Sequence, residues 1–255
     1  MNSGYSCLSF NGDVCMHHKL YSRVLVKIPG HSLGNGGSFD AKKMLHVVRE
    51  LDEIGPATEL LVVPGGNNMV SGAILASELH IAERVAHNVG MLATISNALL
   101  LKAIWNTIRP EREVVVMSAV EIPKLVEPFL PEIIPTHLSH GRVVILAGGI
   151  GQAGVTTDFC AVLNAHNFSA QILIRATDVD GVYDRDPKNT LADPATLLEH
   201  ITYADFLARK LQFLDADTLV FAQTRSVPIR VCNITKHGFL RRAVMGENVG
   251  TLISK

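Results

Sequence analysis

Three apolar stretches of this chain end in glycine-rich loops that could bind phosphate. The loops are Lys27-Ile28-Pro29-Gly30, Val63-Pro64-Gly65-Gly66-Asn67 and Ala147-Gly148-Gly149-Ile150-Gly151. A glycine after a strand is often only a turn residue, but it also lets backbone N–H groups approach an anion closely. In an open α/β sheet the carboxyl ends of the strands meet at one edge, where ligands bind. Three such loops therefore predict a polyphosphate ligand at that edge.

Lys27 places a charge in an otherwise apolar stretch. Its neighbours are Val24, Leu25, Val26 and Ile28, and a charge within a buried strand needs a compensating partner or a function. Phosphoryl transfer depends on positioning and on neutralising negative charge, which a fixed lysine and backbone N–H groups can provide. We therefore favour a phosphate-binding role for Lys27 over that of a solvated lysine at the end of a strand.

The third loop also fits the dinucleotide-binding pattern GxGxxG. Gly149, Gly151 and Gly154 follow an expected strand and open an expected helix, and Asp178 stands at the end of the next strand. That arrangement is typical of a dinucleotide-dependent oxidoreductase. Asp158 counts against this function, because a carboxylate at the helix start would meet the anionic pyrophosphate. The oxidoreductase remains a minor alternative.

Strands and helices alternate along the chain around these loops. Strands are expected at residues 23–28, 59–63, 113–117, 142–147, 171–175, 229–232 and 251–254. Helices are expected from the cap at Asp40 to residue 54, and at 70–107, 122–134, 157–167, 203–210 and 215–225. This alternation predicts an α/β fold with a mainly parallel central sheet that helices cover on both faces.

Composition limits the classes of partner. The chain has 255 residues, 47% of them hydrophobic, and a formal net charge of −1, so it can build a full core and has no strongly basic surface. This predicts small-molecule ligands, with no nucleic acid and no membrane as partners. The apolar tract at 89–105 is too short to span a membrane and is expected to be a buried helix.

The beginning of the chain shows neither periodicity nor an export signal. Residues 1–20 are predicted to be a disordered or loosely attached leader, and the protein is predicted to be cytoplasmic. The cysteines Cys7, Cys15, Cys160 and Cys232 form no CxxC pair. That spacing argues against zinc, a redox motif or a disulfide framework.

Four histidines could be imagined as metal ligands. They are His17, His18, His137 and His140. No carboxylate or cysteine stands beside them at the spacing of a metal site. We therefore predict no protein-bound metal.

Several strings in the chain occur together in one known family. They are Gly90-Met91-Leu92-Ala93-Thr94, Val116-Met117-Ser118-Ala119, Arg142-Val143-Val144-Ile145, Thr156-Thr157-Asp158, Val179-Asp180-Gly181-Val182-Tyr183, Asp186-Pro187, Met245-Gly246-Glu247 and Gly250-Thr251-Leu252-Ile253. With these strings the chain resembles the amino acid kinase superfamily and, within it, the bacterial UMP kinases. The match runs from about residue 23 to the C-terminus.

The resemblance implies a fold and an activity. The fold is a three-layer αβα sandwich, formed by a single amino acid kinase domain over residues 21–255. The part up to about residue 140 would supply the acceptor site and oligomer contacts, and the rest would bind ATP. The activity is transfer of the ATP γ-phosphoryl group to UMP, with Mg²⁺, to give UDP for pyrimidine nucleotide biosynthesis. A homohexamer and allosteric control by GTP and UTP are also implied.

Site residues follow from the same resemblance, position by position. The catalytic residues would be Lys27 and Asp158, with Asp158 orienting Lys27. The ATP-binding residues would be Lys27, Gly30, Gly66, Thr177, Tyr183 and Asp186. The UMP-binding residues would be Gly65, His87, Ile150, Gly151, Thr156 and Thr157. Three of these have structural alternatives, because Tyr183 could be a core aromatic, Asp186 could start a turn and Asp158 could cap its helix.

The acceptor side departs from the family pattern. Pro64 replaces a glycine, Ser71 stands near the position of a phosphate-binding arginine, and His87 replaces the aspartate that accepts from the ribose hydroxyls. The family's TGNPFFTT is here Ile150-Gly151-Gln152-Ala153-Gly154-Val155-Thr156-Thr157. Losing a charge-assisted hydrogen bond to phosphate costs about 1.5–3 kcal/mol.

Two further strings also differ. The family's KxSGE is Lys27-Ile28-Pro29-Gly30-His31, and the lysines of its KATKVDG are Arg175 and Asp178. Two hypotheses therefore stand. The chain is either a working UMP kinase with altered acceptor contacts or a catalytically weak paralogue that acts as a nucleotide-sensing or structural subunit. The retained Lys27 and Asp158 favour activity.

Overall fold

One sheet of nine strands runs through the part of the protein that the structure describes. The computed structural model describes residues 21–185, 194–211 and 213–255, so the predicted leader at 1–20 lies outside the described residues. The strand order is β4-β3-β5-β2-β1-β6-β8-β9-β7. Every adjacent pair is parallel except β8 and β9, which are antiparallel. The predicted mainly parallel sheet is confirmed.

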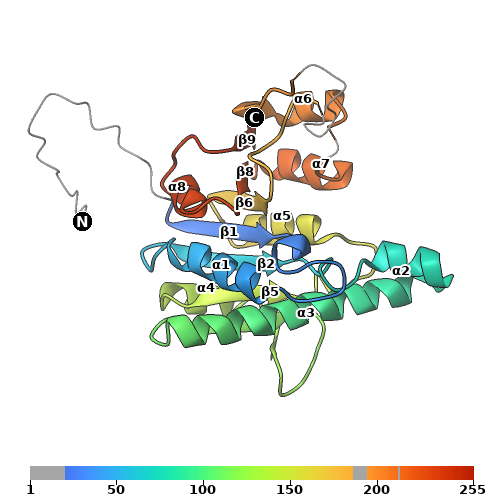
Figure 1. The fold of residues 1–255 in the computed structure, drawn as a ribbon. Helices are drawn as coiled ribbons and strands as arrows, with labels where there is room; N and C mark the ends of the chain where they lie inside the picture. Colours follow the sequence, from blue (N-terminus) through green and yellow to red (C-terminus); the bar gives the residue numbers. More distant parts are fainter. Residues whose placement is uncertain (1–20, 186–193, 212) are drawn as a thin grey trace, which may run out of the picture.

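The elements follow the predicted alternation (Figure 1). The strands are β1 (Arg23–Ile28), β2 (Glu59–Pro64), β3 (Val114–Ser118), β4 (Glu127–Pro128), β5 (Val143–Ala147), β6 (Ile172–Thr177), β7 (His200–Thr202), β8 (Ile229–Asn233) and β9 (Thr251–Ser254). The helices are η1 (Gly30–Ser32, a 3₁₀ turn), α1 (Ala41–Asp52), α2 (Gly72–Leu79), α3 (Glu83–Ile108), α4 (Ile134–Ser139), α5 (Thr157–Asn167), α6 (Tyr203–Ala208), α7 (Ala216–Arg225) and α8 (Phe239–Val244).

Alternating side chains of the strands build two cores, one on each face of the sheet. In β1, Val24 and Val26 pack with residues of α1, α3 and α8. Leu25 packs on the opposite face, with residues of α4, α5, α6 and α7. This is the period of two expected for a strand that is buried on both sides. The three-layer αβα sandwich is therefore confirmed, and Lys27 falls on the same side of β1 as Leu25, facing α5.

Two of the predicted helices were wrong. The stretch 70–107 forms two helices, because His80 adopts a left-handed conformation with φ of 52° that ends α2. The stretch 122–134 contains Pro123, Pro128 and Pro131, which disfavour helix where they stand and in the residue before them. It forms turns and the short strand β4, and the helix there begins only at Ile134.

The α3 helix is buried along one face only. Ala98, Leu101 and Trp105 have no exposed surface, whereas Val89 and Leu92 are 37% and 46% exposed. The expectation of a buried helix at 89–105 therefore holds for one face of the helix only. By length and composition alone α3 could cross a membrane, but 39% of its most apolar window is buried against the rest of the protein. Helices of this kind also occur in cores, so the length carries little weight.

Candidate active site

The glycine loops meet at the carboxyl edge of the central strands. The N–H of Gly65 donates to the carbonyl of Ile28 over 2.7 Å, which joins the first two loops. A Cβ at Gly30 would lie 2.4 Å from the backbone nitrogen of Asn67. Only glycine fits at such a separation. The predicted convergence of the loops is confirmed, and it depends on this close backbone contact.

Polar side chains of α3 hold two of the loops in place. Asn97, fully buried, donates to the carbonyl of Gly65 over 2.6 Å and exchanges hydrogen bonds with the side chain of Asn68. The hydroxyl of Thr94 accepts from the N–H of Gly148 over 2.8 Å. Buried polar groups of this kind form hydrogen bonds with one another, so the loops are held in place only when all of these groups are present. Polar residues in an apolar tract were the sequence signal for this support.

Lys27 forms a buried ion cluster with Asp158 and Arg175. The Lys27 Nζ lies 3.0 Å from Asp158 Oδ2, and the Arg175 Nε lies 2.9 Å from Asp158 Oδ1. The side chains are 5%, 18% and 14% exposed for Lys27, Asp158 and Arg175 respectively. Arg175 also stacks on Phe213, with its guanidinium carbon 4.1 Å from the ring centre. The predicted contact between Lys27 and Asp158 is present, and Arg175 completes the cluster.

The cluster carries one more cation than anion. Burial alone would raise the pKa of Asp158, but the charges of Lys27 and Arg175 outweigh it and hold this pKa below its ordinary value. Burial lowers the pKa of the Lys27 amine; the ion pair with Asp158 opposes this, and the charge of Arg175 adds to it. Asp158 is therefore a carboxylate between two cations. Such an arrangement can stabilise added negative charge, as a phosphoryl group would bring.

Two clefts open beside this cluster. The larger cleft has a volume of about 720 Å³ and is lined by His31, Arg175, Thr177, Asp178, Val179, Gly181, Val182, Tyr183, Asp184, Arg185, Arg209, Lys210, Leu211 and Phe213. The smaller cleft has a volume of about 370 Å³ and is lined by Lys27, Pro29, Gly30, His31, Gly65, Gly66, Asn67, Val70, Ser71, His87, Gly90, Met91, Thr94, Gly149, Gln152, Gly154, Val155, Thr156, Thr157, Asp158 and Arg175.

The two clefts receive most of the predicted site residues. Thr177 and Tyr183 line the larger cleft. Gly30 and Gly66, predicted on the ATP side, line the smaller cleft together with the predicted Gly65, His87, Thr156 and Thr157. Residues after position 140 also line the smaller cleft. Its walls therefore include both the part of the chain predicted to form the acceptor site and the part predicted to bind ATP. Asp186 lies outside the described residues.

Ile150 and Gly151 do not line either cleft. Ile150 is partly buried against the core beneath α5. Gly151 lies against Ala119, whose carbonyl oxygen would be 3.0 Å from a Cβ at this position. Their neighbours Gly149 and Gln152 face the smaller cleft instead. The difference arises from the positive φ angles of the glycines at 148, 149 and 151, which sequence spacing does not reveal.

Two of the predicted residues also hold the site together. The Nδ1 atom of His87 accepts from the N–H of Gly154 over 2.7 Å, so it fastens the third loop to α3. The hydroxyl of Thr156 caps α5 by accepting from Phe159 and donates to Asp215 over 2.9 Å. Asp215 in turn caps α7. The first turns of α5 and α7 are thereby linked at the rim of the smaller cleft.

Sequence reasoning missed three residues near the site. Arg175 was noted only as a departure from the family string, and its pairing with Asp158 appears only in three dimensions. In the sequence, Asp215 indicates only the start of a helix, and His31 is only a departure from the family string KxSGE. The nearest sequence signal was position, since His31 follows the first glycine loop and Arg175 stands near the end of a strand.

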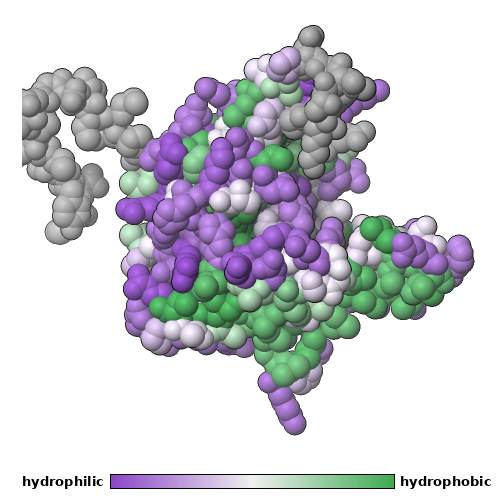
Figure 2. Space-filling view, viewed as in Figure 1, coloured by the Kyte–Doolittle hydropathy of each residue, from purple (hydrophilic) through white to green (hydrophobic). Residues whose placement is uncertain are grey.

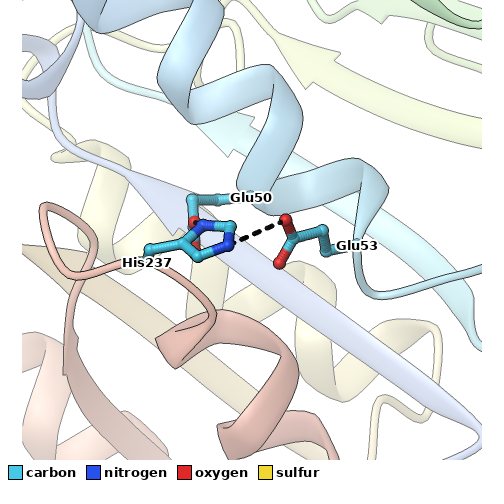
Figure 3. Close-up of side chains that lie close together, drawn as sticks. All are labelled: Glu50, Glu53 and His237. Carbon is cyan, nitrogen blue, oxygen red and sulfur yellow. Dashed lines mark hydrogen bonds and ion pairs between the residues drawn. The ribbon is translucent and has the colours of Figure 1, made fainter.

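A separate cluster joins Glu50 of α1 and Glu53, the residue after this helix, to His237 (Figure 3). None of the three lines either cleft. Glu50 is fully buried, and its carboxylate accepts from the N–H of Gly238 over 3.0 Å and lies 2.9 Å from His237 Nδ1. His237 Nε2 lies 3.5 Å from Glu53. The three ligand atoms are within 4.8 Å of one another, which is the spacing of a metal site. Because Glu50 is already bonded to the start of α8, we assign it the structural role of joining α8 to α1.

Comparison with known proteins gives a consistent result. The sequence profile of the amino acid kinase family matches residues 22–233. The uridylate kinase of Methylococcus capsulatus is 37% identical over 243 residues, covering 93% of this chain and 99% of that protein. The uridylate kinase of Serratia proteamaculans is 39% identical over 242 residues, covering 92% of this chain and 97% of that protein.

Solved structures agree with the sequence comparison. The UMP kinase from Bacillus anthracis superposes with a TM-score of 0.87 at 34% identity, over 92% of this chain and 97% of that one. The UMP kinase from Ureaplasma parvum superposes with a TM-score of 0.84 at 31% identity, over 92% of this chain and 99% of that one. Profile, identity and fold agree over nearly the whole chain. The protein therefore belongs to the amino acid kinase family, and within it to the group that contains the uridylate kinases.

Proposed function

We propose that this protein is a UMP kinase, which transfers the γ-phosphoryl group of ATP to UMP and releases ADP and UDP. The observation that carries the proposal is the Lys27–Asp158–Arg175 cluster, which lies where the two clefts join at the edge formed by the glycine loops. UMP is inferred as the substrate from relatives named uridylate kinase, which are similar over nearly the whole chain. The reaction belongs to pyrimidine nucleotide biosynthesis.

The larger cleft would hold ATP and the smaller cleft UMP. Lys27 and Arg175 then face the phosphoryl group in transit and neutralise its charge, while backbone N–H groups of the glycine loops position it. Asp158 fixes both cations so that no reorganisation is needed during the reaction. The nucleophile is an oxygen of the UMP phosphate, which is already an anion, so the site needs no general base.

Mg²⁺ is expected to enter with ATP. Both oxygens of Asp158 are bonded to Lys27 and Arg175, so this carboxylate is not free to bind a metal. Mg²⁺ commonly stays bound to phosphate oxygens and several waters, which suits a cleft of this kind. When bound it would screen the charge of the ATP phosphates. We assign no residue of this chain as its ligand.

Neither alternative function is favoured. A dinucleotide-dependent oxidoreductase does not agree with membership of the amino acid kinase family. A catalytically weak sensing subunit would explain Ser71, His87 and Pro64, but it would not require the buried cation cluster. An enzyme-coupled assay of ADP release with UMP, CMP, dCMP or no acceptor distinguishes these functions. UMP should give the fastest release, and equal rates with and without UMP would reject the proposed activity.

The contacts of the smaller cleft with UMP are predicted to be weak, and substituting the family's residues is predicted to strengthen them. Ser71 and His87 both line the smaller cleft. Introducing Ser71→Arg with His87→Asp should lower the Michaelis constant for UMP by about tenfold, because it adds a cation for the phosphate and an acceptor for the ribose hydroxyls. Contacts that exist in both ground and transition state change the Michaelis constant rather than kcat. Calorimetry of UMP binding provides a second measurement.

A matched control makes the same change of charge elsewhere. Thr107 and His140 are exposed and line neither cleft, so Thr107→Arg with His140→Asp should leave UMP binding unchanged. Equal UMP affinity in parent and Ser71→Arg, His87→Asp variant would mean that UMP does not bind in the smaller cleft as described.

A homohexamer is part of the proposal, with α2 and α3 in the subunit contacts. Ile74, Leu79, Val85, Val89 and Leu92 are between 37% and 60% exposed. Figure 2 shows apolar surface over α2 and the adjoining part of α3. Exposed apolar patches of this kind commonly mark an interface between subunits. We also propose a cytoplasmic location. Control by GTP and UTP is proposed as well, and adding either nucleotide to the assay tests it.

Light scattering tests the assembly. The expected mass is six times the subunit mass of 27.6 kDa. Leu79→Glu with Leu92→Glu should produce smaller species, because each carboxylate would be buried unpaired in the interface. Val220→Glu, at a 50% exposed position of α7, is the control and should leave the mass unchanged. A monomer mass for the parent protein at micromolar concentration would contradict the assembly.

A further inference from the structure

The walls of the two clefts have two described residues in common. They are His31 and Arg175, each of which borders both the larger and the smaller cleft. A group that passes from one cleft to the other must pass beside them. Arg175 is held by Asp158 and Phe213. His31 lies on the η1 turn that directly follows the first glycine loop, where its position is set by the backbone.

The side chain of His31 contributes little to holding the fold together. Its side chain is 54% exposed, and its Nε2 lies 3.7 Å from Asp178 Oδ1, which is 58% exposed. This distance is that of an ion pair or a loose contact rather than of a hydrogen bond. A polar side chain held so lightly at the junction of two clefts is free to bond to a ligand there. Its partner Asp178 belongs to the wall of the larger cleft.

The two positions depart from the family strings in opposite senses of charge. The string KxSGE has an acidic residue where this chain has His31, and KATKVDG has a basic residue where this chain has Asp178. The chain therefore has a base opposite an acid, with the two exchanged relative to the family. Two independent departures that end as neighbours in space suggest one adapted feature of the site.

We propose that His31 contacts the substrate phosphates in the phosphoryl transfer, donating a hydrogen bond where the two clefts join, while Asp178 orients its ring. This inference rests on the proposed function. No covalent step at the imidazole is required. His31 would position the phosphoryl group at the junction, which Arg175 also borders.

The charge of His31 depends on its surroundings. Burial lowers the pKa of His31; Asp178 opposes this, and the cations Lys27, Arg175 and Lys43 add to it. In the free enzyme the pKa of His31 therefore lies below its ordinary value of 6.5. A neutral imidazole still donates through one nitrogen. Protonation would add a cation facing the phosphates, so it should favour substrate binding as the pH falls.

The first test compares His31→Gln with the parent between about pH 5.5 and about pH 9, a range that brackets histidine titration. Glutamine keeps a donor but does not titrate. The ratio of kcat/KM, parent to variant, cancels ionisation of the substrates. It should stay within about threefold at pH 8 and rise as the pH falls through the pKa of His31. His140→Gln, at an exposed histidine that lines neither cleft, should give a flat ratio.

The second test exchanges the charges. His31→Glu should lower kcat/KM by about 100-fold, because a carboxylate would face both Asp178 and the phosphates. Adding Asp178→Lys should restore most of the loss, since the pair then has the signs of the family strings. Thermal melting of each variant shows whether it is folded, and the exposure of both side chains predicts unchanged melting temperatures.

These outcomes separate the inference from the proposed function. No loss of kcat/KM in His31→Glu, or no recovery on adding Asp178→Lys, overturns the role of His31 while UMP kinase activity stands. A flat ratio for His31→Gln overturns the effect of its protonation. If the parent transfers phosphoryl to no acceptor, the proposed function fails by itself. Calorimetric titration of magnesium-ATP into parent and His31→Glu then decides, and equal affinities would overturn the contact with phosphate.

Discussion

Replacing Lys27 with methionine is expected to lower kcat on the order of 1,000-fold while the fold survives. The loss follows from removing a fixed cation that faces the phosphoryl group. The fold should survive because Lys27 is 4% exposed among apolar neighbours, which accommodate a methionine of similar length. Asp158 would not be left unpaired, since Arg175 still lies 2.9 Å from it. Steady-state ADP release and circular dichroism measure the two effects.

The control for this variant is Lys42→Met. Lys42 is an exposed lysine in the first turn of α1 that lines neither cleft, so kcat should not change. Turnover of Lys27→Met equal to that of the parent would remove Lys27 from the reaction. A variant that unfolds would be replaced by Lys27→Gln, which keeps a polar group for Asp158.

The substitution Asp158→Asn should impair both stability and activity. It leaves Lys27 and Arg175 as two buried cations without their shared anion, and breaking a buried pair in this way costs about 3–5 kcal/mol. Activity should fall on the order of 100-fold, because the two cations would separate from the positions that the carboxylate imposes. Urea unfolding and the ADP-release assay measure these losses.

The pH dependence of stability gives a sharper test of the same cluster. In the parent, the lowered pKa of Asp158 means that its contribution is present above its ordinary value of 3.8 and is lost as the pH falls through the folded pKa. In Asp158→Asn, Lys27 keeps a lowered pKa without its counter-ion. The variant should therefore gain stability as the pH rises toward 10.5, where the unfolded lysine also loses its proton.

Asp217→Asn is the matched control. Asp217 is the second residue of α7, as Asp158 is the second residue of α5, but it is exposed and lines neither cleft. Its substitution should change the unfolding free energy by only about 0.3–1 kcal/mol through the helix dipole. A similar small change for Asp158→Asn would show that Asp158 acts only as a residue of the first helical turn, without a role in the cluster.

The sequence determined the elements whose signals are local. Asp40 bonds to the N–H groups of Lys42 and Lys43 and starts α1 as predicted. The strand at Arg23–Ile28 and the helix at Thr157–Asn167 have the predicted limits. Caps and apolar periodicity act between near neighbours in the chain, so they can be seen without the fold. The family strings added the kinase fold and the contact between Lys27 and Asp158.

The sequence was less informative where distant contacts outweigh local preference. The apolar stretch 70–107 reads as one helix, but the left-handed residue His80 divides it. The short strand β4 exists only because Glu127 and Pro128 pair with the end of β3. The three prolines of the stretch 122–134 disfavour a helix, and backbone pairing with β3 determines the structure that forms.

The composition of the active site was settled by the tertiary structure. Parallel pairing of β1 with β6 places Lys27 directly beside Arg175, on the face that meets the first turn of α5. Strand register depends on which side chains both cores can bury, so a shift of either strand by one residue would turn its cation to the other face of the sheet. From the sequence, Lys27 and Asp158 could be identified as site residues. The register of two strands far apart in the chain brought Arg175 to them, and His31 borders the same two clefts.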